Sequence, residues 1–349
     1  MRQTVTLGMT GIEVNKNGFG ALPIQRISDD EAVFLLRKAY KAGITYFDTA
    51  RAYSDSEHKV GLAFEGIRDK VYIATKSGAQ TGEAMIKDLN TSLETMKTDY
   101  IDVYQFHNPA FVPVPGGADG LYDAALEAKK AGKIKHIAIT NHRLNVAKEA
   151  VLSGYYELLQ FPFCYLSTEA DEELVKLCKE KNIGFVAMKS LSGGLITNSE
   201  AAYAFAAEYD NVLPIWGVQK ENELDEFISY IDNPPIMTEA IKELIEKDKT
   251  ALSGEFCRGC GYCMPCPAGI EINNAARMSL LLRRSPFAGH LSEGGQAMMK
   301  KIEDCLHCGK CKSKCPYGLD TPSLLERNYE DYKKVLAGEI SVAAVDVLK

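Results

Sequence analysis

Eight cysteines toward the C-terminal end constrain most strongly how this chain can fold. They form two tight runs, each ending in Cys-Pro: Cys257, Cys260, Cys263 and Cys266, then Cys305, Cys308, Cys311 and Cys315. Gaps of two or three residues wrap the backbone closely and point successive sulfur atoms inward. Disulfides explain the runs less well, because the chain is 349 residues long and residues 1–6 lack an apolar export signal. The sequence therefore predicts metal binding.

The second run reads C-x2-C-x2-C-x3-C-P, the spacing of bacterial ferredoxins. In those proteins three thiolates hold one [4Fe–4S] cluster and the fourth reaches a second cluster. A crossed assignment follows, with Cys257, Cys260, Cys263 and Cys315 on one cluster and Cys305, Cys308, Cys311 and Cys266 on the other. The first run has two residues before its last cysteine instead of three, so crossed ligation is an expectation that its spacing does not fix. Two four-cysteine zinc sites are the alternative.

The 38 residues between the runs, 267–304, are rich in Leu, Met, Ala and Arg. Their apolar spacing predicts helices rather than short hairpins. We therefore expect a small α-helical ferredoxin-like domain at 255–330, preceded by a linker helix at 233–254 and followed by a tail at 331–349.

The first 232 residues alternate β-rich runs with amphipathic stretches such as 29–41 and 171–181. The predicted strands are 19–22, 45–47, 71–75, 101–106, 134–139, 158–161, 184–188 and 212–216. Eight strand-helix units predict an α/β fold of the (β/α)8 TIM-barrel type. A small hairpin is expected ahead of them, at 5–14. No G-x-G-x-x-G follows an early strand, which disfavours a doubly wound dinucleotide fold.

Net charge excludes one class of partner. The chain carries a formal charge of −7, whereas a nucleic-acid-binding protein needs a basic face. Its sequence has no run of 18 apolar residues, so no membrane segment is expected. We expect a cytoplasmic protein.

Polar side chains follow several predicted strands directly. Asp48 and Tyr53 come after the second strand, Lys76 after the third and His107 after the fourth. Each residue alone would be an ordinary loop residue. In a TIM barrel, however, catalytic side chains gather at the carboxyl ends of the strands. The sequence therefore predicts an active site built from these four residues.

Residues 4–230 resemble the aldo/keto reductase superfamily. The similar segments are GITYFDTARAYSDSE (43–57), YIATKSG (72–78), IDVYQFHNP (101–109), AITNHR (138–143) and LLQFPFCY (158–165). With the cysteine runs added, the chain looks like the ferredoxin-fused branch of that superfamily. The resemblance implies an NAD(P)H-dependent oxidoreductase acting on a small carbonyl or alcohol.

Residue roles follow from the resemblance and from acid-base chemistry. Tyr53 would protonate the alkoxide formed by hydride transfer, and Lys76 would lower the phenol's pKa from its usual value of about 10. Asp48 would hold Lys76 in place, and His107 would orient the carbonyl by a hydrogen bond.

The resemblance also implies a nucleotide site. Asn141 and Gln160 match the carboxamide-binding positions, and Ser190, Leu191 and Gly193 match the loop over the pyrophosphate. Two positions depart from the usual pattern: Met188 replaces the aromatic residue that stacks on nicotinamide, and Glu223 lies where an arginine often binds a 2′-phosphate. A carboxylate there repels a phosphate, so we expect NADH or dual use.

Two function classes are consistent with these patterns. The favoured class is a nicotinamide-dependent oxidoreductase whose two clusters relay electrons to or from a ferredoxin or flavoprotein. The alternative is an electron-transfer or interaction protein whose barrel is a nucleotide-binding scaffold. Besides the relay, two other roles for the clusters stay open: structural staples of a small domain, or a docking platform for a partner enzyme.

Overall fold

The computed structural model describes residues 3–252, 256–284 and 287–342. The chain divides into two compact units. The barrel unit comprises Met1–Ser190 and Ser199–Lys242, and the cluster unit comprises Leu191–Asn198 and Glu243–Lys349. The predicted domain edge at 254/255 and the end of the predicted tail, 343–349, lie outside the described residues.

Eight parallel strands close the barrel in the order β10-β3-β4-β5-β6-β7-β8-β9. Their bounds are β3 Gly18–Gly20, β4 Tyr46–Asp48, β5 Tyr72–Ser77, β6 Ile101–His107, β7 Ile134–Thr140, β8 Leu158–Pro162, β9 Gly184–Met188 and β10 Val212–Gly217. Each strand overlaps one of the eight predicted runs, so the predicted barrel is confirmed. Near-continuous burial along β5, β6 and β8 is typical of parallel strands that are covered on both faces.

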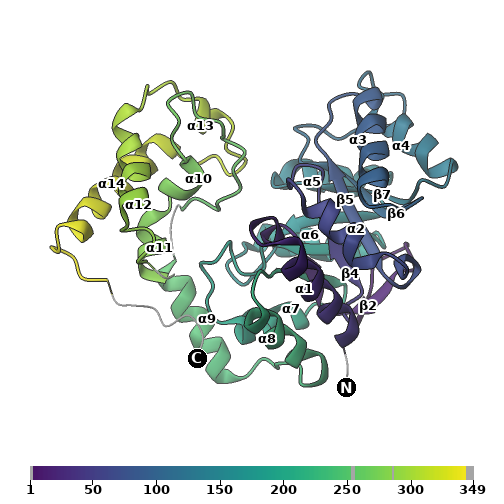
Figure 1. Cartoon of the computed structure of the whole chain (residues 1–349), viewed down its shortest axis with the longest axis horizontal. Helices are drawn as coiled ribbons and strands as arrows, with labels where there is room; N and C mark the ends of the chain where they lie inside the picture. Colours follow the sequence, from purple (N-terminus) through teal and green to yellow (C-terminus); the bar gives the residue numbers. More distant parts are fainter. Residues whose placement is uncertain (1–2, 253–255, 285–286, 343–349) are drawn as a thin grey trace. The chain divides into compact units, whose positions relative to one another are not determined.

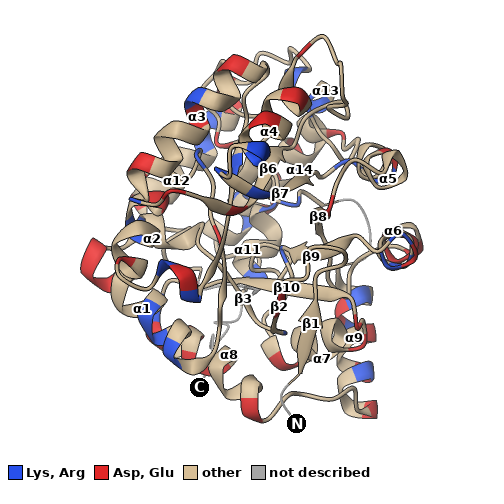
Figure 2. Cartoon of the chain, turned by 90° about the vertical axis from the view of Figure 1, so that its right-hand side faces the viewer, with Lys and Arg blue, Asp and Glu red and all other residues tan. Residues whose placement is uncertain are grey.

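Helices alternate with these strands and surround the sheet (Figure 1). They are α1 Asp29–Ala42, α2 Ser56–Phe64, α3 Gly82–Thr95, α4 Leu121–Lys130, α5 Leu144–Ser153, α6 Glu169–Glu180, α7 Ser199–Ala207 and α8 Glu221–Asp232. Short 3-10 turns lie at η1 Pro23–Arg26 and η2 Arg68–Lys70. Charged side chains lie mainly on the helices, as on α1, α3 and α6 (Figure 2), because the opposite helix faces are apolar and cover the strands.

Local sequence explains where α1 begins. The Ser28 hydroxyl accepts a hydrogen bond from Glu31 N at 3.3 Å, and the Glu31 carboxylate accepts one from Ser28 N at 3.0 Å. This capping box satisfies backbone donors that a helix start otherwise leaves unpaired. Thr168 and Asp171 do the same for α6.

The expected N-terminal hairpin forms from β1 Thr4–Thr6 and β2 Glu13–Asn15, with Val5 opposite Val14. Buried apolar residues of this hairpin share one core with residues of the barrel strands, and Gly8 bridges to Ile183, directly before β9 begins. That core consists of Val5, Leu7, Ile12, Val14, Tyr46, Ala74, Val103, Ala138, Leu158, Val186, Leu213 and Ile215. The hairpin therefore closes the end of the barrel opposite to the strand ends where side chains are available for chemistry.

The cluster unit is helical in its described part, as predicted. Its helices are α10 Ile272–Ala275, α11 Met278–Arg284, α12 Glu293–Lys300, α13 Lys310–Ser313 and α14 Thr321–Leu336, with a 3-10 turn η3 at Lys301–Asp304. The linker helix α9, Glu239–Ala251, crosses the division between the units. Helix α14 continues past residue 330, where the sequence placed the start of the tail. Contacts past that point hold the helix: the buried Tyr332 donates from its hydroxyl to His290 O at 2.8 Å, and Asp331 pairs with Arg283.

No helix in the described ranges is long and apolar enough to cross a bilayer.

Candidate active site

Asp48 and Lys76 form a buried ion pair at the ends of β4 and β5. Lys76 Nζ donates to Asp48 Oδ2 at 2.7 Å and to Thr49 O at 2.6 Å, and the two side chains are 4% and 1% exposed. Burial raises the pKa of Asp48 and lowers the pKa of Lys76, and each partner partly offsets the shift of the other. A buried charge pair of this kind fixes the position of the ammonium group.

Tyr53 and His107 lie beside this pair. Lys76 Nζ is 5.2 Å from the centroid of the Tyr53 ring, and the Tyr53 and His107 rings meet edge to face with centroids 6.0 Å apart. The structure therefore brings together the four side chains that the sequence singled out.

The electrostatics of Tyr53 differ from the simple expectation. Burial raises the pKa of Tyr53 well above its usual range, and the Asp48 carboxylate adds to the increase. The ammonium of Lys76 does not reverse this, since its charge is already paired with Asp48. Burial, and then the Lys76 charge, lower the pKa of His107 to about 3. At neutral pH, the site therefore holds a protonated phenol and a neutral imidazole.

Two glutamines complete the surroundings of Asp48. Gln105 Nε2 donates to Asp48 Oδ1 at 3.2 Å, and Gln160 Nε2 donates to Asp48 Oδ2 at 3.3 Å. Gln105 was missed in the sequence, although a signal was present: it lies two residues before His107 on β6, and residues i and i+2 of a strand face the same side.

Gln160 is suited to bind an amide. Its Oε1 is buried and has no hydrogen-bond partner among the described residues. An acceptor left unpaired in this way fits the amino group of a nicotinamide carboxamide. Asn141 is also fully buried, but its amide already donates to Pro109 O at 2.8 Å and accepts from Arg143 N at 2.8 Å.

The other residues predicted for the nucleotide site are distributed over both units. Met188 ends β9, and Ser190 donates to Ala187 O at 3.1 Å. Leu191 and Gly193 belong to the cluster unit. One carboxylate oxygen of Glu223 accepts from Gln219 N at 3.0 Å and from Lys220 N at 3.1 Å, which caps the start of α8.

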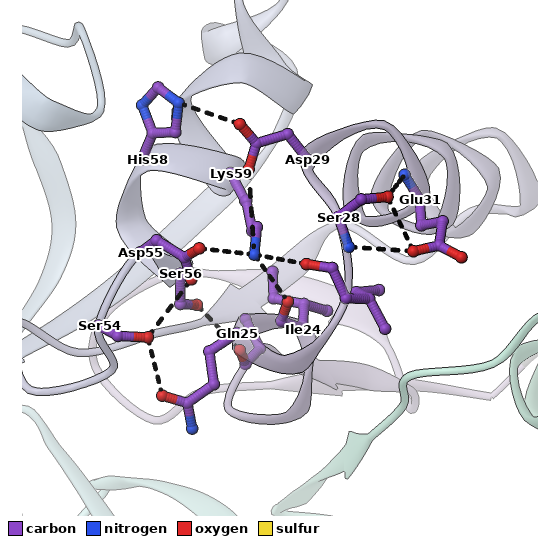
Figure 3. A network of polar contacts seen from close by, with 12 residues as sticks. Ile24, Gln25, Ser28, Asp29, Glu31, Ser54, Asp55, Ser56, His58 and Lys59 are labelled. Carbon is purple, nitrogen blue, oxygen red and sulfur yellow. Dashed lines mark hydrogen bonds and ion pairs between the residues drawn. The ribbon is translucent and has the colours of Figure 1, made fainter.

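A polar network fixes the loop that carries Tyr53 (Figure 3). Lys59, which is 2% exposed, donates to Ile24 O at 3.1 Å, Ile27 O at 2.7 Å and Asp55 Oδ2 at 2.8 Å. Ser56 Oγ donates to Ala21 O at 2.9 Å. These bonds join the loop after β3 to the loop after β4. Nothing in the sequence marked Lys59, because its partners are mostly backbone carbonyls more than 30 residues away.

The eight cysteines of the two runs all lie in the cluster unit, and none of them forms a disulfide within the described residues. Cys266, from the first run, lines a cavity together with Cys305, Cys308 and Cys311 of the second. The cavity is small, with about 20 Å³ of space for water-sized molecules, and is partly open to solvent. Cys263 also reaches its wall.

A second group of sulfur atoms is evident from the charges around Cys257. Burial raises the pKa of the Cys257 thiol, and the sulfurs of Cys260 and Cys315 raise it further. Gly259 N donates to Cys257 Sγ at 3.4 Å. In the described ranges, no three His, Cys, Asp or Glu side chains converge on a point that would suit one metal ion. Ligands of a cubane attach to separate iron atoms at its corners, so they need not converge in that way.

Comparison with known proteins agrees with this division of the chain. Residues 15–202 match the aldo/keto reductase family, and residues 256–320 match the 4Fe-4S dicluster domain. Among curated relatives, L-galactose dehydrogenase of Arabidopsis thaliana is 28% identical over 211 residues, which cover 55% of this chain and 66% of the relative. The uncharacterized oxidoreductase YqkF of Bacillus subtilis is 30% identical over 205 residues, covering 55% and 65%. The chain thus spans about two thirds of the length of these relatives.

Solved structures share the fold. The holo form of aldo-keto reductase AKR11C1 from Bacillus halodurans gives a TM-score of 0.63 at 21% identity, covering 73% of this chain and 99% of that one. An aldo-keto reductase from Klebsiella pneumoniae in complex with NADPH gives 0.62 at 20% identity, covering 71% and 95%. Because the family match alone spans more than half of the chain, this protein belongs to the aldo/keto reductase family and carries a 4Fe-4S dicluster domain.

Proposed function

We propose that the chain is an NAD(P)H-dependent oxidoreductase that interconverts a carbonyl and an alcohol on a small organic substrate. The observation that carries the proposal is the meeting of Tyr53 and His107 beside the buried Asp48–Lys76 pair. An acid, a neutral hydrogen-bond donor and a fixed cation are the groups that carbonyl reduction requires.

A bound reduced nicotinamide supplies the hydride. Tyr53 donates its phenolic proton to the carbonyl oxygen as negative charge develops there. Neutral His107 donates a hydrogen bond to the same oxygen and orients it. Lys76, held by Asp48, stabilises the phenolate that remains after proton transfer. Substrate carbonyl, hydride and proton together give the alcohol.

Tyr53 keeps its proton at neutral pH because burial raises its pKa, and the same shift weakens it as a proton donor unless Lys76 stabilises the phenolate. A phenol that keeps its proton at neutral pH is ready to act as an acid. Oxidation of an alcohol needs the phenolate as a base, which burial disfavours until a nucleotide and substrate change the surroundings.

NADH or dual use remains the proposed nucleotide preference. The resemblance assigns Glu223 to the position where an arginine often binds a 2′-phosphate, and one of its carboxylate oxygens caps α8. The Klebsiella pneumoniae relative was crystallised with NADPH, so titration with both nucleotides is the direct comparison.

For the cysteines, we propose crossed ligation of two [4Fe–4S] clusters, one by Cys257, Cys260, Cys263 and Cys315 and the other by Cys266, Cys305, Cys308 and Cys311. The shared cavity of Cys266 with the second run supports this assignment, as does the proximity of Cys315 to Cys257. A cluster transfers one electron at a time. We therefore propose that the clusters relay electrons to or from a partner such as a ferredoxin or a flavoprotein.

Substituting Tyr53 by Phe tests the catalytic proposal. Anaerobically prepared Tyr53→Phe protein should lose turnover by about 10²–10⁴-fold, the usual contribution of a general acid, and should bind nucleotide as before. Tyr203→Phe is the matched control, because the buried Tyr203 hydroxyl on α7 has no hydrogen-bond partner among the described residues. Turnover that survives Tyr53→Phe would show that another group donates the proton. Cluster reduction by NADH without any carbonyl substrate would favour the electron-transfer alternative.

A further inference from the structure

The loop Leu191–Asn198 lies between β9 and α7 in the sequence, but it belongs to the cluster unit. It carries Leu191 and Gly193, which the family resemblance assigns to the loop over the nucleotide pyrophosphate. A segment proposed to bind the nucleotide is thus part of the same compact unit as the cluster cysteines.

Within this unit, Arg277 contacts both the loop Leu191–Asn198 and the first cysteine run. It lies between α10 and α11, and its Nη1 donates to Gly193 O at 2.9 Å. A side chain at Gly193 would crowd this contact, since an added Cβ would lie 3.0 Å from Arg277 Nη1.

The same guanidinium lies against the first cysteine run. A Cβ added at Gly259 would lie only 2.7 Å from Arg277 Cζ, and Gly259 has a φ of +63°, which other residues rarely adopt. Gly259 lies between Cys257 and Cys260. Absence of a side chain there lets the guanidinium lie close to the backbone of the cysteine run.

The charge of Arg277 has no carboxylate partner in the described part of the chain. The groups that interact with its charge are the sulfurs of Cys257 and Cys260. Arg277 Nε is buried without a hydrogen-bond partner among the described residues. A cluster held by thiolates is an anion with sulfur acceptors, so it would supply the missing counter-charge and the missing acceptor.

We propose that Arg277 is a positioning residue that couples cluster occupancy to nucleotide binding. The cluster on the first cysteine run anchors the guanidinium, and the guanidinium holds the Gly193 carbonyl and orders the loop Leu191–Asn198. Loss of the cluster releases the loop and weakens nucleotide binding. This inference rests on the proposed function only in its last step, the binding of nucleotide.

The first arm of the test measures loop order without nucleotide. Amide hydrogen exchange at residues 191–198 is compared in full-length protein with its iron and after anaerobic chelation, for wild type, Arg277→Gln and Arg283→Gln. Arg283 is the matched control, because it forms a partly exposed ion pair with Asp331 elsewhere in the unit. We expect fast exchange in iron-free wild type and in iron-loaded Arg277→Gln, and slow exchange in loaded wild type and loaded Arg283→Gln.

The second arm measures the affinity for NADH and NADPH by fluorescence titration of the same samples. Couplings between two sites commonly change affinity by 5- to 150-fold, and we expect about 10-fold weaker binding in loaded Arg277→Gln and in iron-free wild type. Chelation of Arg277→Gln should change its affinity little further. Because coupling is reciprocal, nucleotide should slow the release of iron from wild type and not from the variant.

Iron content and cluster absorbance are measured for every sample, and Arg277→Lys is used if Arg277→Gln fails to retain iron. Lysine keeps the cation near the thiolates but lacks the fork of donors that reaches the Gly193 carbonyl. Slow exchange and wild-type affinity in an iron-loaded Arg277 variant would overturn the inference. An exchange pattern as expected, with no nucleotide bound by any sample, would overturn the proposed function and the coupling while leaving the anchoring of the loop intact.

Discussion

The barrel unit and the cluster unit hold their functional side chains in different ways. In the barrel, Asp48, Lys76 and His107 lie at the ends of paired strands, and Asp48 alone accepts hydrogen bonds from Lys76, Gln105 and Gln160. In the cluster unit, Cys311 lies in α13 and the other cysteines of the two runs lie on loops, and α10 and α13 have only four residues each. The barrel therefore prepares its site by protein contacts alone, whereas the cluster unit depends on what its cysteines bind.

Helix length gives a physical reason for this difference between the two units. Helices shorter than about 12–15 residues are marginal by themselves, so α10 and α13 need packing or a bound group to persist. Strands that pair on both sides, as all eight do in the closed barrel, need neither. Four predictions test this contrast, beginning with the largest expected effect.

Iron removal should unfold most of the cluster unit and leave the barrel folded. Metal-binding free energy in small metal-binding domains is also folding free energy. The single tryptophan, Trp216, reports on the barrel alone, because it lies in β10 and stacks on Phe227 with ring centroids 4.4 Å apart. After anaerobic chelation we expect a large loss of helical circular dichroism with unchanged Trp216 fluorescence. A cluster unit that keeps its helical signal without iron would show that its core is sufficient by itself.

The same contrast explains which features of the fold and of the site could be predicted from the sequence. All eight barrel strands were predictable, because buried parallel strands are short apolar runs separated by amphipathic helices. The four catalytic candidates were predictable from their places after those strands. Both signals are local in the chain.

Contacts between distant segments were not predictable. Lys59 binds the carbonyls of Ile24 and Ile27, and Arg277 binds the carbonyl of Gly193, 84 residues away. A backbone carbonyl has the same chemistry at every residue, so no sequence pattern identifies such a partner. For the same reason, the sequence did not predict that Leu191–Asn198 belongs to the cluster unit.

Breaking the buried ion pair should have the second-largest effect. Asp48→Asn leaves the Lys76 ammonium buried without a counter-charge, which typically costs about 3–5 kcal/mol. Urea unfolding followed by Trp216 fluorescence measures the loss. Asp69→Asn is the control in the same barrel: its pair with Lys70 is exposed, and such pairs contribute about 1 kcal/mol or less. Equal effects of the two substitutions would contradict the proposed preorganisation of the barrel site.

Lys59→Met should have a smaller effect on stability and a visible effect on catalysis. The substitution removes a charged donor from two backbone carbonyls and from Asp55, and hydrogen bonds to charged groups contribute about 1.5–3 kcal/mol. Because these bonds fix the loop that carries Tyr53, turnover should fall by about 10-fold, since small displacements of catalytic groups are costly. Lys41→Met, at an exposed position on α1, is the control. Unchanged turnover in Lys59→Met would mean that the Tyr53 loop is held by other contacts.

Per pH unit, the pH dependence of barrel stability is the smallest of the four expected effects. In the folded state the pKa of His107 is about 3, below its ordinary value of 6.5, because burial and Lys76 disfavour the imidazolium. Between pH 6.5 and 3 the unfolded chain therefore binds a proton at this residue that the folded chain does not. Stability is complete above pH 6.5 and falls as the pH decreases, by about 1.4 kcal/mol per pH unit from this group.

The difference between two unfolding curves isolates that contribution. His107→Gln cannot take up the proton, so its stability should fall less steeply with decreasing pH than that of the wild type, with Trp216 fluorescence as the probe. Some slope will remain, because burial also holds the pKa of His142 well below its usual value. Parallel curves for the two proteins would mean that His107 is accessible to protons in the folded barrel. An imidazolium would then be present near pH 6, and the neutral donor proposed for carbonyl binding would be the wrong species.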